Sequence, residues 1–340
     1  MEQSLNIRRS MEIREHEILS PYAAFSDCSL GRDFEEKECD IRPIYQRDRD
    51  RILHSKSFRR LKHKTQVFLA PEGDHYRTRL THTLEVSQIA RTIAKALRLN
   101  EELTEAIALG HDLGHTPFGH AGERALNRIV PDGFKHHLQS LRVVESIENH
   151  GRGLNLSKEV RDGIANHQTS GKPSTLEGKI VRLCDKIAYV NHDIDDAIRG
   201  QIISEDDIPK EYTDILGSSL GKRLDTLVHD IIKNSRNKND IIMSPDIESA
   251  MKHLREYMFH SVYLNKIAKG QEEQAERLLE ELYKYYKQHI DQLPEEYLEK
   301  ESMNDEPHYQ AVVDYIAGMT DRFAVAKFKE LMIPVSWDVY

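Results

Sequence analysis

Four residues with metal-ligand side chains stand in an informative order along this chain. They are His82, the adjacent pair His111 and Asp112, and Asp185. Imidazole and carboxylate groups bind Mn, Fe, Ni, Co, Zn or Mg in mixed nitrogen and oxygen sites. A divalent metal ion held by these residues would keep coordination positions open for water and for a substrate oxygen. It would lower the pKa of that water and polarise a phosphoryl group, so the residues indicate hydrolysis of a phosphate ester.

The helical pattern around these residues predicts that their side chains face inward. His82 precedes Val86 by four residues and His111 follows Ile107 by four, so each extends the apolar stripe of its own segment. Asp185 shares a helical face with apolar neighbours, where a carboxylate is costly unless it is paired or binds a metal. Three helices would thus each direct a ligand inward, as in the metal sites of helical bundles.

Helical signals also dominate the rest of the chain. Asn100 is the expected N-cap of a helix, and Pro117 and Gly119 predict a loop after residue 111. Helices are predicted over residues 81–97, 101–110, 140–148, 175–198, 221–233, 246–268, 271–289 and 307–331, with a short hairpin over 66–76. The predicted class is all-α. We expect an N-terminal segment (1–40), a catalytic core (41–200) and a helical C-terminal region (201–340) that packs on the core.

Composition disfavours several other classes of protein. The 340 residues carry a net charge of −9, which disfavours a protein whose main task is non-specific nucleic-acid binding. Cys28, Cys39 and Cys184 form no CxxC pair, which suits a reducing compartment. The N-terminus has no signal-peptide pattern, and no apolar run reaches the ~20 residues of a membrane span. We therefore expect a soluble, cytoplasmic protein without a membrane segment.

Longer motifs surround the four candidate ligands. They are FRRLKHKTQVF at 58–68, RTRLTHTLEV at 77–86, HDLGHTPFGHAGE at 111–123, STLEGKIVRLCDKIAYVNHDIDD at 174–196 and YIAGMTDRFA at 315–324. With these motifs the chain resembles the dNTP triphosphohydrolases, the dGTPase-like proteins of the HD superfamily. The resemblance implies an HD-domain helical phosphohydrolase fold with a helical C-terminal extension. It also implies hydrolysis of a dNTP, either dGTP or several dNTPs, to deoxynucleoside and inorganic triphosphate by a metal ion bound to the four residues.

The resemblance and the local spacing assign four catalytic residues. His115 stands one helical turn after the start of the metal pair, and His120 is followed three residues later by Glu123. A histidine oriented by a carboxylate can protonate the departing 5′-oxygen or stabilise a phosphate oxygen. His136 matches a family histidine that faces phosphate, with His137 as the alternative.

Another group of residues is expected to bind the nucleotide. Tyr189 and Asp193 lie on the same helical face as the metal-binding aspartate of their segment. Tyr189 would contact the sugar, which is how the family prefers deoxyribose, and Asp193 would accept a hydrogen bond from the 3′-hydroxyl. Lys186 and Arg79 are suited to phosphate oxygens. Gln66 matches a family position that touches the sugar.

Some residues fit two interpretations. His167 could approach the site or could be an ordinary histidine at a helix end, and we leave it out of the predicted site. Tyr315, Asp321 and Arg322 would either close the site over the base or belong to the core.

Two other functions compete with the dNTP triphosphohydrolase. One is a different HD phosphohydrolase, either a nucleoside monophosphatase or a phosphodiesterase, and Tyr189 and Asp193 count against it. The other is a nucleotide-binding or single-stranded-DNA-binding regulatory module, and the intact ligand set counts against that. Weak binding of single-stranded DNA beside catalysis stays open. The resemblance implies a homo-oligomer, a tetramer or hexamer, but the base, the native metal and any allosteric control are not fixed by the sequence.

Overall fold

The computed structural model describes residues 6–66, 77–263, 266–298 and 307–334. This part of the chain consists of helices, loops and one isolated β-bridge between Thr65 and Thr78, which confirms the predicted all-α class. The helices are α1 (Ile7–Ile18), α2 (Ile44–Leu53), α3 (Lys56–Arg60), α4 (Arg79–Ala96), α5 (Glu101–Gly110), α6 (Gly119–Ile129), α7 (His136–Arg142), α8 (Lys158–Ala165), α9 (Leu176–Arg199), α10 (Lys210–Leu216), α11 (Leu220–Ser235), α12 (Pro245–Met258), α13 (Lys266–Gln288), α15 (His308–Gly318) and α16 (Asp321–Met332). In these residues no helix has the length and apolar character needed to cross a membrane.

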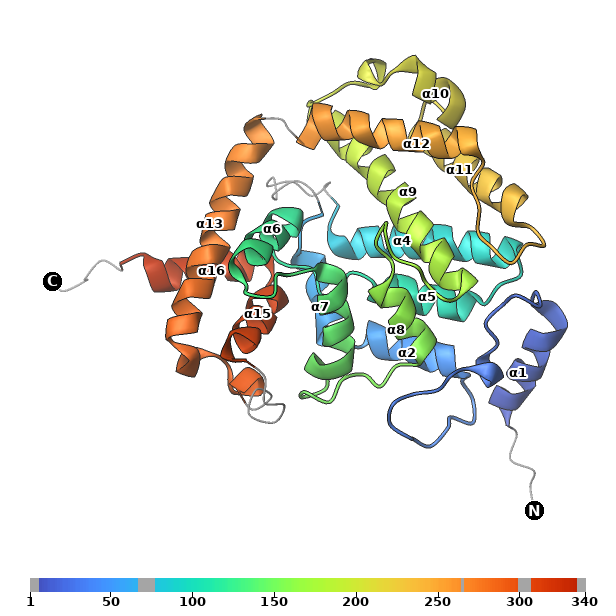
Figure 1. The fold of residues 1–340 in the computed structure, drawn as a ribbon, viewed down its shortest axis with the longest axis horizontal. Coiled ribbons are helices and arrows are strands. Elements are labelled where there is room, and N and C mark those ends of the chain that lie inside the picture. Colours follow the sequence, from blue (N-terminus) through green and yellow to red (C-terminus); the bar gives the residue numbers. More distant parts are fainter. Residues whose placement is uncertain (1–5, 67–76, 264–265, 299–306, 335–340) are drawn as a thin grey trace.

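Two hydrophobic cores organise the helices. The larger core draws on α2, α4, α5, α8, α9, α11 and α12, and α4 packs against both α5 and α9 near its centre. The smaller core unites α6 with α13, α15 and α16, which stand together on one side of the molecule (Figure 1). The C-terminal helices therefore pack on a helix that directly follows the His-Asp pair in sequence. The division of the chain at residue 200 stays a prediction.

Local capping explains where the site helices begin. Helix α4 starts at Arg79, two residues before the predicted start, because Thr78 and Thr81 form a reciprocal capping box. The predicted N-cap at Asn100 is confirmed, since its side chain accepts hydrogen bonds from two backbone amides of α5. Thr175 caps α9 in the same way.

Other boundaries differ from the predicted ones. The helix expected at 140–148 begins at His136 and passes into a π turn, Val143–Ile147. The segment expected at 307–331 is interrupted, because Thr320 caps a new helix, α16. Six helices were not predicted, namely α1, α2, α3, α6, α8 and α10. The predicted hairpin lies, apart from Gln66, outside the described residues.

Candidate metal centre and active site

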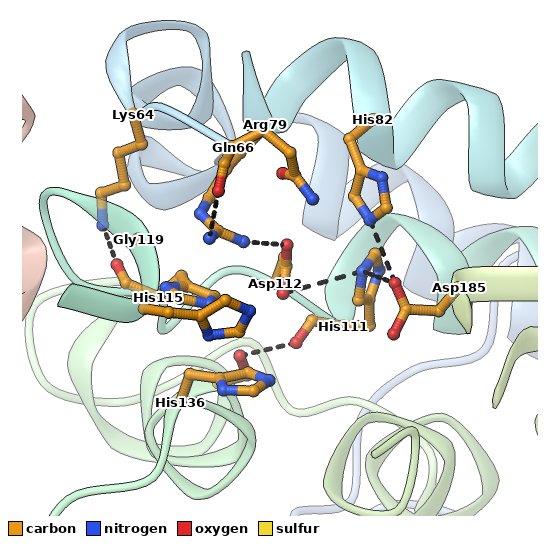
Figure 2. Close-up of polar contacts among 12 residues, drawn as sticks. Lys64, Gln66, Arg79, His82, His111, Asp112, His115, Gly119, His136 and Asp185 are labelled. Carbon is orange, nitrogen blue, oxygen red and sulfur yellow. Dashed lines mark hydrogen bonds and ion pairs between the residues drawn. The ribbon is translucent and has the colours of Figure 1, made fainter. Parts of the chain in front are cut away.

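The four candidate metal ligands meet between three helices (Figure 2). His82 comes from α4, His111 ends α5, and Asp185 comes from α9. Asp185 Oδ1 lies 3.0 Å from His82 Nε2 and 3.6 Å from His111 Nε2, and Asp112 Oδ1 lies 3.7 Å from His111 Nε2. The structure therefore brings together all four residues that the sequence selected.

The hydrogen bonding of the two histidines fits a bound metal. His111 Nδ1 lies 2.6 Å from the carbonyl oxygen of Ala108 and donates to it, so Nε2 is the ring nitrogen that a metal ion could bind. Within the described parts of the chain, this buried Nε2 has no hydrogen-bond partner, and neither has the buried Nδ1 of His82. Unpartnered buried nitrogens are rare in native proteins, and a divalent cation would satisfy this one at His111.

The charges of the site also fit a cation. Burial favours the neutral form of Asp112, but Arg79 and His111 hold its pKa well below the usual range. Burial would likewise raise the pKa of Asp185, but His111 and His82 hold it well below its usual range. Burial alone would lower the pKa of His111, yet Asp112 and Asp185 raise it to about 9. Two ionised carboxylates thus hold a proton at a place where a metal ion could replace it.

Arg79 and Gln66 lie directly behind the metal ligands. Arg79 is buried and donates from Nη1 to Asp112 Oδ2 at 2.6 Å and from Nη2 to the backbone oxygen of Gln66 at 3.4 Å. Gln66 is also buried, and its side-chain oxygen has no hydrogen-bond partner among the residues that the structure describes. In this arrangement Arg79 orients Asp112, a candidate metal ligand, and the predicted contact of Arg79 with the triphosphate stays a prediction.

The four predicted catalytic residues form a second cluster beside the metal ligands. The rings of His115 and His136 stack with their centroids 4.5 Å apart. Glu123 contacts Nδ1 of His136 at 2.9 Å and Nδ1 of His120 at 3.4 Å. Burial raises the pKa of Glu123, but the two histidines outweigh it and keep the carboxyl ionised. The alternative, His137, instead donates to the carbonyl oxygen of Ala165.

His167 belongs to this cluster although the sequence analysis left it out. Its Nε2 lies 3.1 Å from His136 Nε2, and its ring centroid lies 5.0 Å from that of His111. Its Nδ1 donates to the carbonyl oxygen of Ile164, so its Nε2 can only accept. His136 must then donate from both ring nitrogens, to His167 and to Glu123. Burial and the neighbouring His111 lower the pKa of His167 to about 3, which keeps it neutral.

His192 is a second buried histidine that was overlooked. Its ring centroid lies 5.7 Å from that of His82, and its Nε2 lies 3.0 Å from a carboxylate oxygen of Glu85. The only sequence signal for His192 was its position next to Asp193, and this does not indicate that its imidazole points toward His82.

The predicted nucleotide-binding residues follow Asp185 along α9. The Tyr189 ring lies 5.9 Å from the ring of His120. Asp193 is fully buried, neither of its oxygens makes a well-aligned hydrogen bond to the described residues, and burial together with Asp196 raises its pKa well above the usual range. Lys186 is half-buried, and burial and Arg255 of α12 lower its pKa. A hydroxyl donor would therefore find a partner at Asp193, and the predicted phosphate contact of Lys186, beside α12, stays a prediction.

Gly114 allows the turn after the His-Asp pair to lie against α7. Ser140 Oγ accepts from the Gly114 amide at 2.9 Å and donates to the His111 carbonyl at 2.7 Å. A Cβ at residue 114 would lie 2.1 Å from the Ser140 nitrogen. We expect Gly114→Ala to destabilise the fold by about 1–3 kcal/mol, measured by urea unfolding. Gly221→Ala, where a Cβ meets nothing within 4 Å, is the control, and equal stability of the two variants would contradict the prediction.

Comparison with known proteins agrees with this geometry. Residues 79–190 match the HD domain family and residues 241–330 match the phosphohydrolase-associated domain. A "Deoxyguanosinetriphosphate triphosphohydrolase-like protein" of Caldanaerobacter subterraneus subsp. tengcongensis is 58% identical over 98% of both chains. A protein of the same name from Clostridium perfringens is 49% identical over 97% of this chain and 98% of its own. A phosphohydrolase structure from Bacteroides thetaiotaomicron shares the fold, with a TM-score of 0.52 and 18% identity over 83% of this chain and 68% of that one.

Proposed function

The chain belongs to the deoxyguanosinetriphosphate triphosphohydrolase-like family of HD phosphohydrolases, and from this we propose that it hydrolyses a dNTP to deoxynucleoside and inorganic triphosphate. The substrate is dGTP or several dNTPs. The observation that carries the proposal is the convergence of His82, His111, Asp112 and Asp185 next to the cluster around Glu123. The same ligands would serve another HD phosphohydrolase, and the buried Asp193 favours the nucleotide substrate because a 3′-hydroxyl could donate to it.

The proposed cofactor is a divalent metal ion, one of Mn, Mg, Ni, Co, Fe or Zn, held by the four HD residues. When bound, it would lower the pKa of a water molecule and would place a positive charge beside the negatively charged phosphoryl oxygens. Arg79 fixes the orientation of Asp112 from behind, as second-layer partners of metal ligands do.

The remaining side chains act on the leaving group and on the charge of the phosphate. His120 is the most exposed of the clustered histidines, with 47% of its side chain accessible, and Glu123 orients its ring. It is therefore the proposed general acid for the departing 5′-oxygen. His115 and His136 are proposed to face the phosphate oxygens. Glu123 and His167 contact the two ring nitrogens of His136 and so fix the orientation of that ring.

Tyr189 is proposed to contact the sugar and exclude a 2′-hydroxyl. We expect Tyr189→Ala to lower the ratio of kcat/KM for dNTP over the matching ribonucleotide by about 10-fold or more, because the wall beside the sugar is lost. Tyr189→Phe keeps the ring and should keep most of the preference. The measurement is steady-state kinetics with both nucleotides, and an unchanged ratio in Tyr189→Ala would remove Tyr189 from the sugar contact.

Anion-exchange analysis of the products tests the proposed function. Purified protein with Mn²⁺ is incubated with each dNTP, alone and mixed, and we expect deoxynucleoside and triphosphate in equal amounts. His82→Ala is the inactive control. Release of orthophosphate from a nucleoside monophosphate, without action on dNTPs, would instead indicate a monophosphatase.

Several partner and location assignments accompany this proposal. We propose a cytoplasmic homo-oligomer, a tetramer or hexamer, without a membrane partner and with at most weak binding of single-stranded DNA. The acidic net charge of −9 supports the last point. Light scattering and a salt-dependent DNA-binding titration measure these properties directly.

A further inference from the structure

Three distant segments meet behind the catalytic loop. They are residues 64–66 before α4, residues 115–119 between the His-Asp pair and α6, and residues 317–321 at the corner between α15 and α16. Lys64 is buried, at 2% exposure, and its Nζ donates to the carbonyl oxygens of His115 and Ala317. Figure 2 shows this side chain pointing at His115.

Asp321 joins the same segments from the other side. One of its oxygens accepts from the Thr65 amide at 2.9 Å and from the Thr65 hydroxyl at 2.7 Å. The other accepts from the Phe118 amide at 3.0 Å. The carboxylate is 7% exposed, so these hydrogen bonds are made away from solvent, where losing one leaves a buried donor unpaired.

The Phe118 contact bears on catalysis because of the backbone at this point. Phe118 and Gly119 have φ values of +61° and +56°, and a left-handed phenylalanine is unfavourable unless its surroundings hold it. Helix α6 starts at Gly119, and its first turns carry His120 and Glu123. The Asp321 hydrogen bond therefore fixes the point from which these two side chains project.

The burial of Lys64 and Asp321 argues against a role in stability alone. Two buried charged groups generally stabilise a fold no more than apolar residues of similar size would. Lys64 and Asp321 instead fix the local geometry, because their hydrogen bonds set the relative positions of three backbone segments. Two of those segments carry proposed site residues, namely Gln66 and His115, and His120 directly follows the second of them.

We propose that Lys64 and Asp321 are positioning residues through which the C-terminal helices hold the catalytic loop in its working geometry. The expected loss of turnover rests on the proposed function, whereas the expected change in the mobility of the catalytic loop does not. It assigns a role in the reaction to the phosphohydrolase-associated region, which supplies Asp321 and Ala317. This region lies far from the HD residues in sequence.

Asp321→Asn tests the proposal with little change in volume. Asparagine has one carbonyl oxygen, so it cannot accept from both Thr65 and Phe118. We expect kcat to fall by roughly 10-fold or more, with KM within about 2-fold and the metal content unchanged. Hydrogen exchange should become faster in residues 114–123 and stay unchanged in α4 and α9. If Asp321→Asn does not fold, Lys64→Met is the second variant, with the same expectation.

Asp48→Asn is the matched control, because Asp48 is a buried carboxylate that binds Arg32 and the Ser157 amide away from the site. It should lower stability and leave kcat unchanged. An unchanged kcat in Asp321→Asn, or a loss that accompanies loss of metal, would overturn the proposal. If the wild-type protein turns over no dNTP, the proposed function fails, and exchange in residues 114–123 alone then decides whether the positioning role stands.

Discussion

Asp185→Asn is expected to lose its bound metal and to lower turnover by roughly 10³-fold or more. The carboxylate lies 3.0 Å from His82 Nε2 and 3.6 Å from His111 Nε2, and its low pKa keeps it ionised. Asparagine keeps the shape but removes one of the two negative charges that face the cation. The side chain is 27% exposed, so the fold should tolerate the change.

Metal content by elemental analysis and turnover of dNTP are the two measurements. Asp195→Asn is the matched control on the same helix, because Asp195 is similarly exposed, at 31%, and pairs with Arg77 and Arg199 instead. That variant should keep both metal and activity. Removal of metal from the wild-type protein by a chelator should reproduce the Asp185→Asn phenotype, and Mn²⁺ should reverse it. Full metal content and full activity in Asp185→Asn would contradict the assigned site.

Glu123→Gln is expected to lower kcat by roughly 10²–10³-fold while the metal stays bound. Glu123 faces the ring nitrogens of His120 and His136, and these histidines keep its pKa far below the usual value against the effect of burial. Glutamine has no charge and only one acceptor oxygen, so it cannot keep all the contacts that the two carboxylate oxygens make to the two imidazoles and to the His136 amide. The orientation of the proposed general acid and of the neighbouring histidine is then weakened.

The control for this variant is Glu276→Gln on α13. Glu276 also stands between two cationic side chains, Arg124 and Arg128 of α6, but these arginines are exposed and their partners are carboxylates of α13. It should keep kcat within about 2-fold, since surface ion pairs contribute little. Equal kcat values in Glu123→Gln and the wild-type protein would show that the carboxylate has no part in catalysis.

Local sequence signals predicted much of the central helical framework. The apolar spacing around His82 and His111 and the cap at Asn100 depend only on near neighbours, and the structure has these helices close to where they were expected. Helix α6 was missed because its start depends on the left-handed Phe118, which a remote carboxylate holds. A pattern within one segment cannot reveal such a contact.

The same limit applies to the candidate site. The four candidate metal ligands and the residues around Glu123 could be selected because a family motif carries them. His167 could not be separated from an ordinary helix-end histidine, because its partner His136 lies 31 positions away. The sequence left open whether Tyr315 and Asp321 close the site or belong to the core. Tyr315 is buried against Tyr286 and Tyr297 in the smaller core, whereas Asp321 contacts the loop beside the site.

Hydrolysis of a dNTP in ¹⁸O-labelled water, with mass spectrometry of both products, is the most direct test of the central claim. If water attacks the α-phosphorus, one ¹⁸O atom enters the triphosphate and none enters the deoxynucleoside. We expect this result for the wild-type protein with Mn²⁺, and no product with Asp185→Asn. Release of a monophosphate and pyrophosphate, or ¹⁸O in the deoxynucleoside, would contradict the proposed reaction.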